Sequence, residues 1–297
     1  MRRPLSSLGK FFRYGPCVMV CAAAAWAGPA FAQDVPTSPP QESAPVPPAS
    51  PQRATFYITP GISVPLSSGD DSVGGETTGP RTGTSPVAFV DMRYSPKESW
   101  FAGVTLYGYL EDRQEWQGDF SYAFGYDDWR PNTFSLVYEN YTNNRFNPED
   151  DEPVSRIEYG TVSAGYKFLL PDGIRSPAAN EGDEGRVNCR VGYHITPRYE
   201  TDLGPDRHNK QSGSVGCRAP IWRNLFVDLT AYDYFAGEQQ PWDPDFVYSF
   251  GWFDWRPNHF SLQYTNYSGT RYPWRDSSPR TGRFNDGAIT ATYNLAF

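Results

Sequence analysis

The chain has 297 residues, a formal net charge of −8 and a mean hydropathy of −0.61, and 16% of its residues are aromatic. An acidic chain of this kind is repelled by nucleic acid, so we expect no nucleic-acid partner. Its longest apolar run, residues 17–27, is shorter than the roughly 20 residues that a membrane-spanning helix requires, so the sequence predicts no such helix.

Residues 1–32 have the features of a secretory signal peptide. The apolar run follows four basic residues, and Ala30-Phe31-Ala32 supplies the small-residue pattern before the expected cleavage site. Removal of this segment takes away no acidic residue and lowers the net charge from −8 to −12. The sequence therefore predicts an exported chain in an environment that permits disulfides.

Residues 33–53 contain seven prolines among Ser, Gln and Ala. Such a segment cannot build a sheet ladder and favours an extended, solvated chain. We interpret it as a tether, and a binding role for it stays open.

The rest of the chain, 54–297, contains an internal duplication. Asp-Trp-Arg-Pro-Asn at 128–132 recurs at 254–258, and the match continues with a constant offset of 126. The two copies cover about 54–170 and 186–297.

Each copy contains six runs in which apolar and polar residues alternate with the period of a β-strand. Most have 10 to 14 residues, which is longer than usual for a globular protein and suits a tilted membrane crossing. The connections between these runs alternate between short turns and mostly longer polar loops, as in transmembrane barrels. The sequence predicts an all-β fold, a single antiparallel transmembrane barrel of about twelve strands. The expected strands are 55–65, 86–95, 98–111, 117–127, 132–143, 157–170, 186–198, 211–220, 223–235, 243–253, 257–268 and 286–297.

The alternation also predicts which face encloses the lumen. Phe120, Tyr122 and Phe124 share one face of their strand, while Asp119 and Ser121 share the other. We expect the aromatic face to meet lipid and the polar face to line the lumen. The expected lumen residues are Asp91, Arg93, Tyr107, Asp119, Glu139, Lys167, Arg190, His194, Arg218, Asp228, Tyr232, Asp245 and Gln263.

Acidic and basic side chains are similarly frequent in this set. Such a wall can line a narrow aqueous pathway, because twelve strands lie between the eight that side chains fill and the sixteen that leave an open channel. It can equally form a closed network of ion pairs that fills the barrel. Both interpretations stay open at this stage.

The chain ends with Tyr293-Asn294-Leu295-Ala296-Phe297, an alternating strand closed by Phe. This pattern resembles the sorting signal that outer-membrane β-barrel proteins of Gram-negative bacteria present to their assembly machinery. The resemblance implies an outer-membrane, porin-like protein, with a periplasmic tether and with membrane lipids and lipopolysaccharide as partners. It suggests a channel for small hydrophilic or saccharide solutes, or the outer-membrane part of a polysaccharide export system. A non-conducting anchoring barrel is the main alternative.

The repeated turn holds Trp129 and Arg130 in one copy and Trp255 and Arg256 in the other. Pro presets the backbone of a turn and Asp or Asn caps its amides, so we interpret the motif as a structural turn with its Trp at the membrane interface.

Arg145 and Arg271 follow equivalent strands at the expected extracellular rim. Arginines there can bind lipopolysaccharide phosphates or meet a sugar-like solute, or they can simply pack their own loops.

Cys189 and Cys217 have the same outward parity on neighbouring strands. They form either a cross-strand disulfide or two separate thiols. We expect no metal site because no His cluster accompanies them, and no cofactor. No Ser/His pair falls on the lipid face, so we expect no enzyme; an outer-membrane lipid hydrolase is the third hypothesis.

Overall fold

The computed structural model describes residues 55–66, 85–97, 99–111, 117–128, 130–142, 144–148, 152–171, 186–201, 204, 206–254, 256–266, 270–272, 274 and 284–297. The expected signal peptide and tether lie outside these residues, as do Trp129 and Trp255. No helix of the described part is long and apolar enough to cross a membrane.

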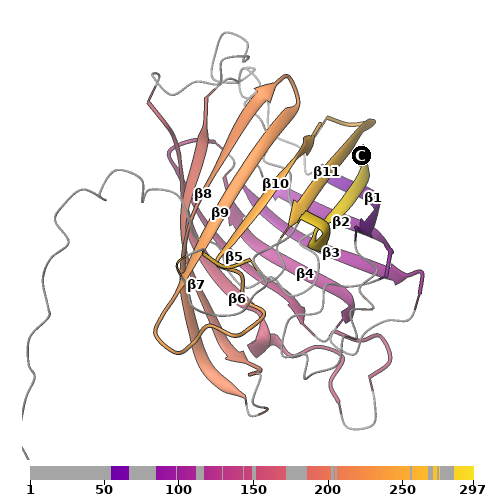
Figure 1. Ribbon diagram of the computed structural model, residues 1–297. Coiled ribbons are helices and arrows are strands. Elements are labelled where there is room, and N and C mark those ends of the chain that lie inside the picture. Colours follow the sequence, from indigo (N-terminus) through magenta and orange to yellow (C-terminus); the bar gives the residue numbers. More distant parts are fainter. Residues whose placement is uncertain are drawn as a thin grey trace, which may run out of the picture.

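Twelve antiparallel strands pair in sequence order, and β1 pairs with β12, so the sheet closes into a barrel (Figure 1). The predicted fold class is confirmed. The strands are β1 (Thr55–Pro65), β2 (Val87–Lys97), β3 (Trp100–Tyr109), β4 (Gln117–Asp127), β5 (Thr133–Thr142), β6 (Thr161–Leu169), β7 (Asn188–Tyr199), β8 (Arg207–Trp222), β9 (Leu225–Tyr234), β10 (Phe246–Trp252), β11 (His259–Asn266) and β12 (Ala288–Ala296).

Two ends of the barrel can be told apart by their connections. One end, called the turn end here, carries the short connections β2–β3, β4–β5, β8–β9 and β10–β11, together with the start of β1 and the end of β12. The other, the loop end, carries mostly longer connections, including β5–β6 and β11–β12, while the long β6–β7 connection lies at the turn end. The β7–β8 hairpin is the longest pair and forms the left wall in Figure 1.

Burial along the strands is the reverse of that in a soluble protein. On β5, Phe134 is 71% exposed and Leu136 is 56% exposed. On the opposite face, Thr105 of β3 and Ser121 of β4 pair with each other and are 2% and 3% exposed. An apolar outer skin around a polar interior is the arrangement that a surrounding hydrocarbon phase stabilises.

Two 3-10 helices cover the outer wall near the loop end. They are η1 (Ile157–Tyr159), which lies within the range predicted as the sixth strand, and η3 (Phe284–Asp286). The hydroxyl of Tyr138 donates to the Ile157 carbonyl at 2.7 Å, and that of Tyr264 donates to the Phe284 carbonyl at 2.6 Å. These contacts satisfy phenol groups that the strand pattern points outward.

Candidate functional site in the lumen

The register places the expected lumen residues on the buried, polar face. Asp91, for example, pairs with Thr59 on one side and Thr105 on the other, and Thr105 donates to its carboxylate at 2.8 Å. Twelve of the thirteen lie within strands of this parity, and Asp245 immediately precedes β10.

Arginine and phenylalanine pair on this face at the turn end. The Arg93 guanidinium lies 3.9 Å from the centroid of Phe101, and that of Arg218 lies 3.6 Å from Phe226. Arg93 and Arg218 are equivalent positions of the two copies, so the same cation–π contact occurs on both sides of the barrel. It fixes two cations close to the wall.

A cavity of about 220 Å³ lies against the wall formed by β5, β6, β7 and β8. It extends along β5 from Ser135, near the turn end, to Tyr141, near the loop end. Six residues of a strand span about 20 Å, so the cavity follows much of the barrel's depth. Its chemistry comes chiefly from Glu139, Lys167 and Arg190, together with His194.

Two glycines reduce the side-chain volume on the cavity wall. Gly165 and Gly192 are directly paired across β6 and β7, and both line the cavity. A Cβ on Gly165 would lie 2.7 Å from the Ser135 hydroxyl, and one on Gly192 would collide with the Ser214 hydroxyl. At these two positions the strands contribute no side chain of their own, and small hydroxyl side chains of the adjacent strands lie over the glycines.

The basic groups of the cavity are not equally neutralised. Lys167 forms an ion pair with Asp127 at 2.6 Å. Arg190, its direct cross-strand neighbour, has its Nη2 3.4 Å from the hydroxyl of Thr230 and, within the described chain, no carboxylate at ion-pair distance. Of the thirteen expected lumen residues, Arg190 alone is classed as exposed.

His194 lies four residues after Arg190 on the same face of β7. Its Nδ1 is 2.7 Å from the Ser163 hydroxyl, while its buried Nε2 has no hydrogen-bond partner among the described residues. This Ser and His face the lumen and not lipid. No group of three or more potential metal ligands occurs in the described part of the chain.

The loop end of the lumen differs because a buried network fills it near β8, β9 and β10. Lys210 is 4% exposed and forms an ion pair with Asp243, which is fully buried. The ammonium lies 5.4 Å from the ring centroids of both Tyr199 and Tyr234. Sequence reasoning missed Lys210 because it began this strand at 211, although Lys210 continues the inward parity of Ser212.

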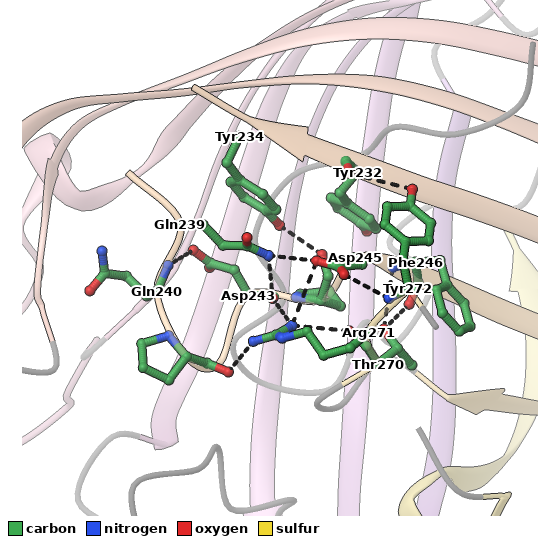
Figure 2. Close-up of polar contacts among 12 residues, drawn as sticks. Tyr232, Tyr234, Gln239, Gln240, Asp243, Asp245, Phe246, Thr270, Arg271 and Tyr272 are labelled. Carbon is green, nitrogen blue, oxygen red and sulfur yellow. Dashed lines mark hydrogen bonds and ion pairs between the residues drawn. The ribbon is translucent and has the colours of Figure 1, made fainter. Parts of the chain in front are cut away.

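Arg271 also belongs to this closed region (Figure 2). It is 9% exposed and donates to the backbone carbonyls of Pro241, Asp243 and Thr270. The carboxylate of Asp245 accepts a hydrogen bond from the amide of Tyr272 at 2.7 Å. Arg271 thus ties its own loop to the β9–β10 loop and does not present a rim cation to solvent.

The first copy repeats this arrangement, called the latch here, in which an Arg donates to a backbone carbonyl and an Asp accepts a loop amide. Arg145 donates to the carbonyl of Gln117, the position equivalent to Asp243, and Asp119 accepts the amide of Phe146 at 2.9 Å. Of the three roles considered for Arg145 and Arg271, the geometry supports loop packing. Asp119 and Asp245 serve the same latches at the edge of the lumen.

The repeated turns carry short ion pairs outside the strands. Arg130 donates from Nε to Asp128 at 2.9 Å, and Arg256 donates to Asp254 at 2.8 Å in the same way. These hydrogen bonds hold the pKa of each carboxyl below its usual value. Asn132 and Asn258 have φ near +60°, a conformation that Asn tolerates.

Cys189 and Cys217 are directly paired on β7 and β8 and are joined by a disulfide with an S–S distance of 2.08 Å. The bond closes a 28-residue separation around the longest hairpin of the barrel. It lies on the outer face, away from the cavity.

No model of a known protein family matches the sequence, and no curated protein matches it. Among solved structures, an outer-membrane channel of Pseudomonas putida F1 has a TM-score of 0.39 at 10% identity, covering 84% of this chain and 97% of its own. OmpF of Salmonella typhi in complex with daunomycin has a TM-score of 0.31 at 8% identity, covering 82% and 97%. At these values the likeness adds nothing to what the strand pairing of this chain shows by itself.

Proposed function

We propose that the protein is an outer-membrane channel through which small hydrophilic solutes pass along the cavity of the β5–β8 wall. The supporting observation is the combination of an apolar exposed skin with a polar cavity that extends through much of the barrel's depth. Outer-membrane lipids and lipopolysaccharide would surround the skin, and the assembly machinery would receive the C-terminal strand.

The saccharide specificity considered from the sequence has a narrower basis. Its basis is that two tyrosines, Tyr141 and Tyr232, line the cavity, and aromatic side chains are common in pockets that bind small molecules. We keep small hydrophilic solutes as the proposal and treat saccharides, and a role in polysaccharide export, as narrower cases of it.

Planar-bilayer recording of the purified full chain tests the channel. Gly165→Phe would fill the cavity and should lower the unitary conductance. Val162→Phe is the matched control, because Val162 lies on the outer face of the same strand and is 38% exposed. Unitary steps in the wild type that Gly165→Phe leaves unchanged would show that solutes take another path.

A non-conducting anchoring barrel is the second candidate, and the buried network at the loop end favours it. Lys210 and Asp243 form a buried ion pair in this part of the lumen, and the ammonium also lies close to the rings of Tyr199 and Tyr234. A wild-type protein that inserts into bilayers and gives no current steps would support this candidate over the channel.

A further inference from the structure

The cross-strand pair of Lys167 and Arg190 places two cations opposite each other on the lumen face. Like charges in directly opposed positions destabilise a sheet unless something offsets them. Asp127 offsets Lys167 at 2.6 Å. Among the described residues, the Arg190 guanidinium has the Thr230 hydroxyl as its hydrogen-bond partner and no carboxylate at ion-pair distance, so no ion pair of the described barrel neutralises this charge.

The position of Arg190 makes this charge available to a ligand. Its side chain is exposed and lines the 220 Å³ cavity. Gly165 and Gly192 contribute no side chains to this wall, which leaves room for a small molecule. A guanidinium presents several N–H donors in a planar fork, a geometry that matches a carboxylate. Lumen water alone would hydrate it, but an anion would also relieve the repulsion from Lys167.

His194 provides a second, independent polar group in the same cavity. Its Nδ1 is occupied by Ser163, and its Nε2 is buried without a partner. An orphaned buried nitrogen is costly unless a ligand or water satisfies it. His194 and Arg190 lie four residues apart on one face of β7, about 13 Å along the strand, which is the length of a small extended molecule.

We propose that Arg190 and His194 form a binding site for a small polyhydroxylated carboxylate, with the carboxylate on Arg190 and a hydroxyl of the ligand on His194. Lys167 supports the site by its charge. This inference rests on the proposed channel function and narrows it, because it makes organic anions such as sugar acids the preferred solutes. Glu139, at the loop-end side of the same cavity, would disfavour a second carboxylate there.

Calorimetric titration of the detergent-solubilised full chain with gluconate and with glucitol tests the site. The two probes share a polyol chain and differ in the carboxylate. We expect gluconate to bind at least about tenfold more tightly, a difference of about 1.4 kcal/mol, because charge-assisted hydrogen bonds are stronger than neutral ones. Arg190→Gln should abolish this preference and Arg190→Lys should keep part of it.

Arg198→Gln is the matched control, because Arg198 lies on the same face of β7 but is already paired with Asp206 at 2.6 Å. It should keep the gluconate preference. Equal affinities of the wild type for gluconate and glucitol would overturn the site, and so would an Arg190→Gln protein that retains the preference. If Arg190→Gln fails to fold, judged by the boiled and unboiled gel mobility, the wild-type probe pair and Arg190→Lys still decide.

Bilayer recording separates this inference from the function on which it rests. A protein that binds gluconate but gives no current would keep the site and refute the channel. A conducting protein with no gluconate preference would keep the channel and refute the site.

Discussion

The cavity beside β5–β8 and the closed loop end beside β8–β10 are both polar, both on the inward face, and opposite in character. In the cavity, Gly165 and Gly192 remove side-chain bulk and Arg190 keeps an exposed charge. At the loop end, Lys210 and Asp243 are buried against each other. Residues that face inward therefore do not by themselves leave an open path for solutes. Small residues leave room in the lumen beside β5–β8, and a buried ion pair occupies it beside β8–β10.

Thiol labelling tests most directly whether the cavity is open to reagent and the loop-end network is closed to it. Ser163→Cys places a thiol in the cavity, whereas Ser212→Cys places one at a 2% exposed position of the closed region. A membrane-impermeant thiol reagent should label the first and leave the second unlabelled, because a thiolate reacts only where the reagent can reach it. Mass spectrometry of the intact protein measures the result, and Cys189 and Cys217 give no background while they remain bonded. Equal labelling would remove the distinction.

The closed network should contribute strongly to stability. Asp243→Ala leaves the ammonium of Lys210 buried without its carboxylate, which should cost about 3–5 kcal/mol in urea unfolding from lipid vesicles. The matched variant Asp127→Ala removes a pair whose side chains are 19% and 21% exposed, and it should cost less because water reaches the remaining ammonium. The double variant Lys210→Met/Asp243→Asn should recover much of the loss. Similar costs for the two single variants would contradict the contrast.

Arg271 tests the latch that holds the loop 236–245 over the closed end. Arg271→Ala removes donors to three carbonyls, and bonds to a charged donor contribute about 1.5–3 kcal/mol. We expect lower stability and faster proteolysis within that loop. Arg256→Ala, whose side chain is 56% exposed, is the control and should change proteolysis little. An intact loop in Arg271→Ala would show that other contacts hold it.

The smallest expected effect on stability concerns Asp128 and Asp254, the carboxylates of the repeated turns. Asp128 and Asp254 bind a proton less readily in the folded protein than when unfolded, because Arg130 and Arg256 favour the charged form. Their contribution is present above the ordinary Asp pKa of about 3.9 and is lost as the pH falls through the lowered value.

Asp128→Asn/Asp254→Asn should therefore lose less stability than the wild type between neutral pH and about pH 3. Urea midpoints at the two pH values measure it. A wild type and a variant with the same acid sensitivity would show that these Asp–Arg pairs contribute nothing to the pH dependence.

Much of the fold could be predicted because strand alternation is a local signal. The first strand was expected at 55–65 and is observed at Thr55–Pro65. The β8 start was placed at 211 instead of Arg207, because His208, Asn209 and Lys210 are polar on both faces and hide the alternation. That shift alone removed Lys210 from the expected lumen.

The site was less accessible to sequence reasoning, since its decisive features involve contacts between strands. Nothing in the sequence around Arg271 shows that backbone carbonyls of another loop would occupy its donors. Nor does the pattern around Arg190 show that its opposite neighbour Lys167 takes the nearby carboxylate. Pairing Gly165 with Gly192 likewise requires the register between β6 and β7.

The central claim is that the aromatic face meets acyl chains while the polar face encloses water. Single-cysteine variants along β5, each carrying a fluorophore and reconstituted in vesicles with brominated lipids, test it most directly. The account predicts strong quenching at positions 134 and 136 and weak quenching at 135 and 137, with a period of two. Uniform quenching, or the opposite phase, would contradict it.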